Sequence, residues 1–338
     1  ANIVKYLNIL TKTDYKPAAI ITRPDFLMTA NLPRVLSNTS VTTYLKISDG
    51  CSNRCTYCVI PTIRGKARSR MPDDILKEAR MLAARGIKEI IITGQDTTAY
   101  GRDLPNHPRL SDLLSEISKV KNIKWIRLLY AHPAHITTEV MKTIAENKKI
   151  CRYIDLPIQH IDDNILKAMN RKVTAGKIKQ IITEARKIIP DVALRTSIIV
   201  GFPGETKKRF ENLLTFITEA RFDHLGVFPY SHEEGTKAVL LSSRISEAEK
   251  ERRRDLIMHE QAAISNRINQ NLIGSIQEII IEGKSDRSDY AYIGRCRRQA
   301  PEIDGITYVN GDRVKTGAVI NCKITAADDY DLFARAMD

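Results

Sequence analysis

Three cysteines lie close together in the first quarter of the chain, at Cys51, Cys55 and Cys58. Three and then two residues separate them, so all three thiolates belong to one short loop. Three thiolates can hold three irons of a cubane iron–sulfur cluster while the fourth iron keeps no protein ligand. Reactive metal sites need such an open position. The spacing therefore predicts a cluster that can bind and activate a further molecule.

A structural zinc site is the main alternative for these cysteines. Structural zinc takes four protein ligands, but the nearest histidine downstream of the loop is His107. The other cysteines, Cys151, Cys296 and Cys322, are scattered along the chain. They form no disulfide framework, and we expect them to be buried, inert thiols. The loop thus favours metal or redox chemistry.

Six apolar stretches alternate with helical patterns after residue 41. We expect strands at 42–48, 88–93, 124–130, 152–158, 193–200 and 224–230. Residues 206–220, for example, lie between the last two of these stretches and carry apolar side chains at helical spacing. Repeated strand–helix alternation predicts a parallel sheet with right-handed crossovers. Such sheets carry their functional groups at the carboxyl ends of the strands, and Cys51 follows the first strand.

The C-terminal region changes its pattern. A capping box at Ser246 and Glu249 predicts a long helix that ends near residue 270. Short period-two stretches with tight turns follow, and they predict a small antiparallel β-barrel. We therefore divide the chain into residues 1–40, a linker and the tail of an upstream domain that is missing, then 41–270 and 271–338. No apolar run approaches the ~20 residues of a membrane span, so we expect a cytoplasmic protein with no membrane partner.

The cysteine loop resembles the signature of the radical S-adenosylmethionine (SAM) superfamily, C-x3-C-x2-C, with Tyr57 as the aromatic residue before the last cysteine. The resemblance implies a partial (βα)6 TIM-like barrel whose [4Fe–4S] cluster binds SAM at the open iron. In that family one electron from the cluster cleaves SAM, and the resulting 5′-deoxyadenosyl radical takes a hydrogen atom from the substrate. The resemblance also implies SAM contacts at strand ends, for which the candidates are Tyr57, Gly94, Gln95, Gln159, Arg195 and Ser197. No catalytic residue of the chain is predicted.

Longer stretches resemble a narrower group, the methylthiotransferases. These stretches are residues 44–70, 155–160 and 197–206, and the C-terminal barrel resembles a TRAM domain. Members of this group carry an upstream domain with a second [4Fe–4S] cluster, which this chain is expected to lack. The resemblance also implies an electron donor such as flavodoxin or ferredoxin.

Residues 95–101, 228–235 and 300–305 resemble the RimO-like branch, which modifies the β-carbon of an aspartate in ribosomal protein number twelve of the small subunit. The net charge agrees with a protein substrate, because it is +15 through Arg244 but −2 from Asn271 onward. A domain that grips tRNA should be basic, whereas a mildly acidic barrel suits a basic ribosomal protein. Arg295, Arg297 and Arg298 could still form a local basic patch.

Two alternatives remain at this point. One is a MiaB-like enzyme that modifies an adenosine in tRNA. The other is a zinc-stabilised RNA-binding protein without catalysis. The modified product, on protein or on nucleoside, distinguishes the two enzymes, and bound iron or zinc distinguishes enzyme from binder. Among the histidines near strand ends, we single out only His160, which follows Gln159 in the matched stretch 155–160.

Overall fold

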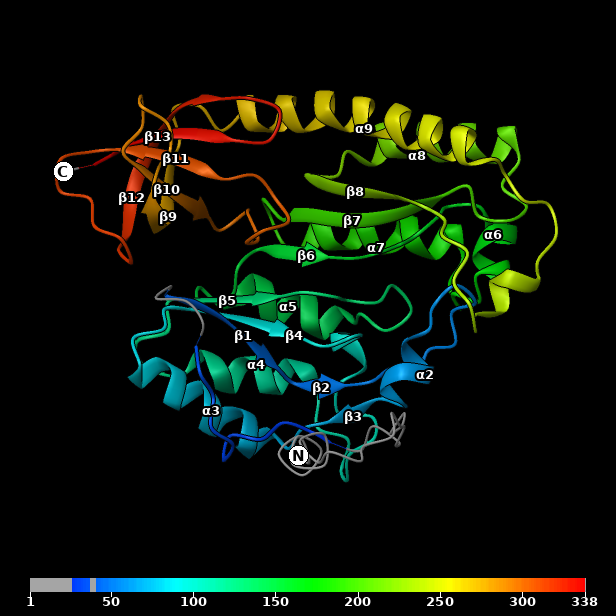
Figure 1. Ribbon diagram of the computed structural model, residues 1–338. Coiled ribbons are helices and arrows are strands. Elements are labelled where there is room, and N and C mark those ends of the chain that lie inside the picture. The colour runs from blue at the N-terminus through cyan, green and yellow to red at the C-terminus, as the bar shows by residue number, and fades with distance from the viewer. Residues whose placement is uncertain (1–25, 37–40, 338) are drawn as a thin grey trace, which may run out of the picture.

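A computed structural model describes residues 26–36 and 41–337 of the chain (Figure 1). Most of the expected linker at residues 1–40 therefore lies outside the described residues. The rest of the chain contains two barrels, one half-open and parallel and one small and closed.

Six parallel strands form the half-open barrel, which we call the parallel half barrel. The first three, in spatial order, are β1 (Thr42–Lys46), β4 (Glu89–Thr93) and β5 (Trp125–Leu128). The other three are β6 (Tyr153–Asp155), β7 (Ala193–Val200) and β8 (His224–Pro229). A short parallel bridge between Ile126 and Ile150 joins the two groups. All six strands expected from the sequence are present, and the expected partial (βα)6 barrel is confirmed.

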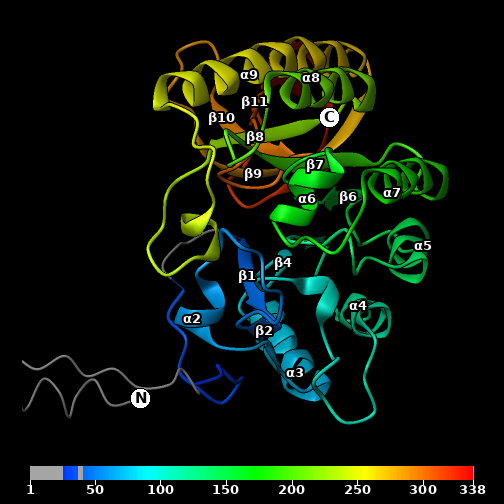
Figure 2. The same ribbon diagram turned by 90° about the vertical axis from the view of Figure 1, so that its right-hand side faces the viewer.

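Helices cover the outer side of the parallel half barrel, as Figure 2 shows from the carboxyl ends of the strands. They are α3 (Pro72–Ala84), α4 (Leu110–Ser118), α5 (Thr138–Glu146), α7 (Ala175–Ile188), α8 (Lys207–Ala220) and α9 (Glu247–Gln270). Four of them begin at a Ser or Thr whose hydroxyl accepts a hydrogen bond from the first helical turn: Thr137, Thr174, Thr206 and Ser246. Their apolar faces pack on the strands in one core. The hydroxyl caps and the 3.6-residue apolar spacing explain why these segments are helices.

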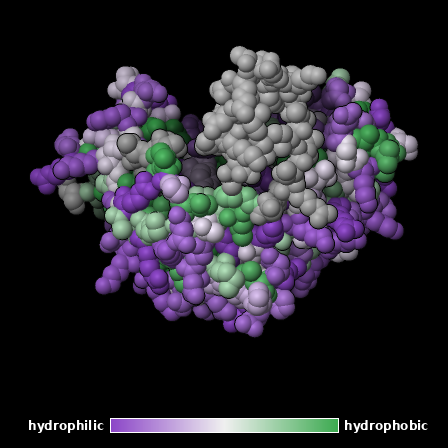
Figure 3. Space-filling view, turned by 60° about the horizontal axis from the view of Figure 1, so that its bottom comes forward, coloured by the Kyte–Doolittle hydropathy of each residue, from purple (hydrophilic) through white to green (hydrophobic). Residues whose placement is uncertain are grey.

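Short elements complete the loops at the carboxyl ends of the strands. They are the hairpin strands β2 (Ser48–Asp49) and β3 (Arg68–Ser69), the helices α2 (Ile60–Arg64) and α6 (Asp163–Ala168), and the 3₁₀ turns η1 (Thr97–Ala99) and η2 (Lys237–Leu240). The face shown in Figure 3 is mostly hydrophilic, with small groups of hydrophobic side chains. In the described part of the chain, no helix has the length and apolar character needed to cross a membrane.

The C-terminal barrel is closed and has five strands. They are β9 (Ile276–Lys284), β10 (Tyr292–Cys296), β11 (Thr307–Asn310), β12 (Val319–Ala327) and β13 (Leu332–Ala336). Four of the five pairings are antiparallel, as expected, but β11 runs parallel to β13. The sequence pattern did not predict β11, because this strand is only four residues long and one of its two buried positions, Thr307, is polar.

The C-terminal barrel closes the amino end of the parallel half barrel (Figure 1). A shared apolar cluster joins Trp125 and Tyr153, the first residues of β5 and β6, to Ile280 of β9 and Ala300 of the β10–β11 loop. Polar contacts surround this cluster. Trp125 Nε1 donates to a carboxylate oxygen of Glu278 at 2.6 Å, and the Tyr153 hydroxyl donates to Asp304 at 2.7 Å. The two barrels therefore share one interior boundary.

A fully buried carboxylate stands at the centre of this boundary. Glu89, at the start of β4, accepts from Arg127 Nε at 2.9 Å and from Arg295 Nη2 at 2.6 Å, and all three side chains are at most 1% exposed. Arg297 pairs with Glu278 at 2.8 Å, and Arg298 pairs with Asp223. The suggestion that Arg295, Arg297 and Arg298 form a basic patch is therefore wrong, because carboxylates of the same chain hold all three.

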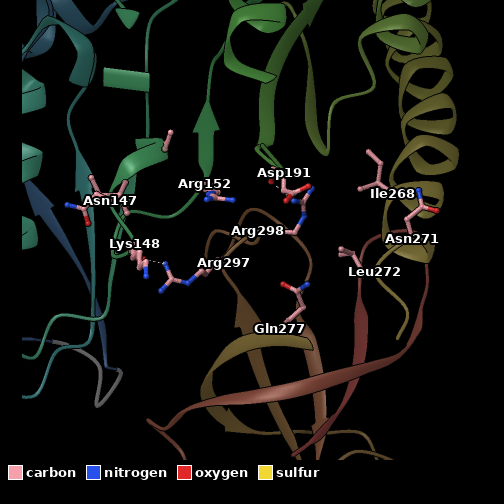
Figure 4. A pocket seen from close by; sticks show the side chains of 12 residues that line it. Asn147, Lys148, Arg152, Asp191, Ile268, Asn271, Leu272, Gln277, Arg297 and Arg298 are labelled. Atoms are coloured by element: carbon pink, nitrogen blue, oxygen red, sulfur yellow. Dashed lines mark hydrogen bonds between the residues drawn. The ribbon is translucent and has the colours of Figure 1, made fainter. Parts of the chain in front are cut away.

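Figure 4 shows the cleft of about 760 Å³ that remains beside this boundary. Arg297 and Arg298 line it, but each also donates to a main-chain carbonyl of the parallel half barrel, Lys148 O at 3.0 Å and Asp191 O at 2.7 Å. Arg297 and Arg298 therefore extend across the cleft from the C-terminal barrel and already donate hydrogen bonds to the parallel half barrel.

Candidate functional site

The cysteine loop leaves the β2 strand and enters α2. Gly50 starts it with a φ of +77°, and a Cβ there would lie 2.3 Å from the carbonyl oxygen of Lys66. Only glycine fits such a close approach. The Cys51 N–H then donates to Gly65 O at 3.1 Å, which closes the base of the loop. The backbone therefore forms a compact turn that presents the following side chains to one side.

All three loop cysteines carry free, partly exposed thiols, whereas Cys151, Cys296 and Cys322 are free and buried, as expected. Burial raises the pKa of the Cys51 and Cys58 thiols above the usual value. A bound metal deprotonates coordinating thiols. The donor set fits an iron–sulfur cluster: three accessible sulfurs on one loop, with no disulfide among them.

The three cysteines open into a cavity of about 590 Å³ at the carboxyl ends of the strands. Its walls come from the loops after β1, β4, β5 and β6 and from the strands β7 and β8. The lining residues are Cys51, Asn53, Cys55, Tyr57, Cys58, Ile60, Thr93, Gly94, Gln95, Tyr130, Ala131, His132, Pro157, Gln159, Arg171, Ser197, Ile199 and Phe228. Eight of the nine site residues expected from the sequence are in this set, and they come from four separate segments of the chain.

Arg195 is the exception, and it does not line the cavity. It lies nearer the amino end of β7, where Nη1 contacts Asp155 at 2.9 Å and Nε approaches Asp304 of the C-terminal barrel at 3.4 Å. Arg195 is the first of six consecutive β7 residues that pair with β8, and only the later positions Ser197 and Ile199 line the cavity. The structure thus assigns Arg195 to the boundary between the barrels, not to the cavity.

Backbone geometry shapes the walls of the cavity. Gln159 has a φ of +71° and Tyr130 a φ of +57°, both in the left-handed region that non-glycine residues rarely adopt. Gln159 is fixed there because its N–H donates to Ser197 O and its carbonyl accepts from Ile199 N–H, each at 2.9 Å. At Gly94, a Cβ would lie 2.6 Å from the Ser48 hydroxyl. These positions keep main-chain atoms close to the cavity.

Arg171 and His132 line the cavity but were not among the site residues predicted from the sequence. Arg171 is buried, and its Nη1 lies 3.7 Å from Cys55 Sγ. It comes from the loop after α6, 113 residues beyond the last cysteine of the loop, and matches no local motif. His132 is buried as well, and its Nδ1 accepts from the Ala134 N–H at 3.1 Å. Its position after β5 was the only signal in the sequence.

Asp96, His132 and His135 form a second polar group beside the cavity. Their potential ligand atoms lie within 4.8 Å of one another, as a metal site would require. Asp96 is already satisfied, however, since it accepts from Asn53 at 2.7 Å and Thr98 at 2.8 Å and contacts His135 at 2.6 Å. We interpret the group as a hydrogen-bonded brace that ties Asn53 of the cysteine loop to the loops after β4 and β5.

His160, the histidine singled out in the sequence, lies outside the cavity lining. It is fully buried, its Nδ1 accepts from Asp162 N–H at 3.0 Å, and its Nε2 is 3.4 Å from Glu205. Glu205 in turn pairs with Arg253 of α9 at 2.6 Å. His160 is therefore a buried structural residue that does not line the cavity.

Comparisons with known proteins give a consistent result. A model of the radical SAM superfamily matches residues 45–217, and a model of the TRAM domain matches residues 273–337. The ribosomal protein uS12 methylthiotransferase RimO of Syntrophus aciditrophicus is 54% identical over 340 residues, which cover 99% of this chain and 75% of the relative. The enzyme of the same name from Geobacter sulfurreducens is 47% identical over 309 residues, 91% of this chain and 69% of the relative. Among solved structures, the radical SAM enzyme HemN of Escherichia coli aligns with 75% of this chain and 64% of its own, at 16% identity and a TM-score of 0.49.

Proposed function

We propose that this chain, which belongs to the RimO family of methylthiotransferases within the radical SAM superfamily, holds its [4Fe–4S] cluster on Cys51, Cys55 and Cys58 and modifies ribosomal protein uS12. The cavity carries this proposal. Three free thiols and the expected strand-end positions converge on one space of about 590 Å³. The relatives named for this activity match over nearly the whole chain.

The residues present fit the two cofactors of the family. The three cysteines would hold the cluster, and Tyr57, Gly94, Gln95, Gln159 and Ser197 would bind SAM beside it. When bound, cluster and SAM together supply a one-electron cleavage that produces a radical able to remove a hydrogen atom from an unactivated carbon. The chain's own contribution is position and exclusion of water.

Several residues of the cavity are suited to positioning SAM and excluding water. Gly94 and Gln159 bring main-chain atoms to the surface of the cavity, and the Gln95 Oε1 atom is buried without a hydrogen-bond partner. A buried polar atom of this kind needs a partner, which a bound ligand provides. Ile60 and Ile199 line the same space with apolar surface. An apolar wall keeps water from the reacting groups.

The substrate would enter from the rim of the cavity. Tyr130 and Phe228 both line the cavity and remain 45% and 54% exposed. Exposed aromatic side chains are common anchors at protein interfaces. We infer that they receive the uS12 segment with the target aspartate, whose β-carbon loses a hydrogen and gains a methylthio group.

Protein rather than tRNA as the substrate has support from charge. Arg295, Arg297 and Arg298 of the C-terminal barrel are paired with carboxylates at its boundary with the parallel half barrel. The net charge from Asn271 onward, with these arginines included, is −2. Since phosphate contacts supply most of the affinity for nucleic acid, this barrel favours a basic protein partner.

The described residues provide cysteines for one cluster, because Cys151, Cys296 and Cys322 are buried at separate places. We infer that sulfur comes from a second [4Fe–4S] cluster whose ligands lie outside this sequence. An electron donor such as flavodoxin or ferredoxin and a cytoplasmic site of action complete the proposal. We also propose the division into residues 1–40, 41–270 and 271–338.

Cys55→Ser tests the cluster assignment. The reconstituted chain should hold about four irons, show the visible absorption of an iron–sulfur cluster and cleave SAM, and Cys55→Ser should lose all three properties. Cys322→Ala, which removes a buried thiol of β12, is the matched control and should keep them. If Cys55→Ser retains iron and SAM cleavage, the assignment is wrong.

Product analysis tests the substrate. Incubation with uS12 and with tRNA should give SAM cleavage coupled to the protein substrate only, with the methylthio mass gain on uS12 once the second cluster is supplied. A methylthio group on a tRNA nucleoside would contradict the proposal. Complete methylthiolation by the present chain alone would contradict the need for a second cluster.

A further inference from the structure

Arg171 differs from the other buried arginines in the described part of the chain. Five arginines are buried there, with Arg171 included. The other four pair with a carboxylate of the chain: Arg70, Arg127, Arg253 and Arg295. Arg171 is 5% exposed and forms no ion pair with a described carboxylate. Buried charges in proteins are almost always paired. Arg171 therefore lacks the counter-charge that its burial requires.

The donors of Arg171 point to where that counter-charge belongs. Nη1 lies 3.7 Å from Cys55 Sγ and 3.5 Å from the Tyr57 hydroxyl oxygen, and Nη2 donates to the carbonyl of Pro157. Nε is buried and has no partner. The guanidinium also lines the cavity shared by the three cysteines. Its nearest potential anion is thus the cysteine loop itself.

The local backbone holds Arg171 in this place. The residues on either side, Asn170 and Lys172, have φ values of +56° and +53°. Such conformations cost energy in non-glycine residues and persist where the surroundings fix them. Asn170 Nδ2 donates to Arg54 O at 2.7 Å, and Thr56 N–H donates to Met169 O at 3.0 Å. The arginine loop and the cysteine loop are therefore joined as one unit.

We propose that Arg171 is a positioning residue that supplies the counter-charge of the cluster and favours its one-electron reduced state. The inference rests on the proposed cluster ligands. Three thiolates give the cluster a net negative charge, which grows by one when it accepts an electron from a low-potential one-electron donor. No bond forms or breaks in that step. A fixed cation in a water-poor site stabilises the more negative form more strongly, and hydrogen bonds to the sulfurs tune the potential of such clusters.

A redox titration without SAM, followed by the electron paramagnetic resonance signal of the reduced cluster, tests the proposal. At the midpoint potential of the wild-type chain, Arg171→Gln should lower the ratio of reduced to oxidised cluster at least tenfold, which corresponds to a shift of about 59 mV for one electron. Arg171→Lys keeps the charge and should change the ratio less than threefold. Arg54→Gln removes an exposed cation from the same loop and should change it less than twofold.

The possible results separate the two levels of the argument. If Arg171→Gln holds iron and keeps the wild-type ratio of reduced to oxidised cluster, the inference is wrong. If the ratio is unchanged and SAM binds more weakly, the inference is also wrong, and Arg171 is assigned to SAM binding instead. If Arg171→Gln holds no iron, the melting temperature of the iron-free protein decides. An unchanged value supports a counter-charge role, and a lowered value indicates a structural role and overturns it. A wild-type chain that binds no iron overturns the proposed function instead.

Discussion

Glu89→Gln is the most informative test of how the two barrels are joined. Glu89 accepts from Arg127 and Arg295, and none of the three side chains is more than 1% exposed. Glutamine keeps the shape of the side chain and one acceptor oxygen. It removes the one carboxylate that pairs with Arg127 among the described residues, while Arg295 keeps a second carboxylate, Glu282, at 2.7 Å.

The expected loss follows from these contacts. Breaking a buried ion pair by neutralising one partner costs about 3–5 kcal/mol. For a chain of 338 residues the entropy of unfolding is about 0.7 kcal/mol per kelvin, so the melting temperature should fall by about 4–7 °C. Scanning calorimetry or circular dichroism at pH 7 measures this shift.

The pH dependence gives an independent check. Burial opposes ionisation of Glu89, but Arg295 and Arg127 outweigh burial and hold the pKa of this carboxyl below its usual value. A lowered folded-state pKa contributes stability above the unfolded pKa, about 4.3, and this stability is lost as the pH falls through the folded value. The difference in melting temperature between the wild type and Glu89→Gln should therefore narrow below about pH 4.

Glu282→Gln is the matched control, because Glu282 is 24% exposed and shares Arg295 with Glu89. A partly exposed pair contributes about 1 kcal/mol or less, so this variant should melt within about 2 °C of the wild type. A loss of less than about 1 °C in Glu89→Gln, or equal losses in both variants, would refute the view that Glu89 anchors the boundary.

Three further predictions concern single positions. Gly305→Ala should prevent stable folding or lower the melting temperature by several degrees, because the new Cβ would lie 1.8 Å from Tyr330 O; soluble yield and a thermal melt report this. Gly176→Ala, at a helical position with nothing within 4 Å of the new Cβ, should instead stabilise by about 0.5–1 kcal/mol, and a lower melting temperature would contradict it. Phe228→Ala should raise the KM for uS12 several-fold while SAM cleavage without uS12 stays within twofold, and an unchanged KM would remove Phe228 from the docking surface.

Much of the fold could be predicted from the sequence because its signals are local. The six strands are apolar runs, and the helices between them carry apolar spacing and hydroxyl caps such as Thr206. Eight of the nine predicted site residues also line one cavity, because parallel strands place their carboxyl ends together. The structure shows this convergence, while the ligands themselves remain a proposal.

The remaining features depend on contacts between distant segments. Arg171 approaches Cys55 across 116 positions of sequence, and no local pattern announces it. Arg195 lies on the expected strand, but its side chain is held at the other end by Asp155 and by Asp304 of the C-terminal barrel. The role of Asp304 could not be predicted, because it depends on how the β10–β11 loop enters the parallel half barrel.

The contacts between the two barrels limit which C-terminal barrels can be combined with this parallel half barrel. Trp125, Tyr153 and Glu89 each find a polar partner in the C-terminal barrel: Glu278, Asp304 and Arg295. A hybrid chain that took its C-terminal barrel from a relative with different residues at these three positions would bury an indole N–H and a phenol without these partners, and would leave Glu89 with Arg127 but without Arg295. Exchange of C-terminal barrels between relatives therefore requires matched changes at the amino end of the parallel half barrel.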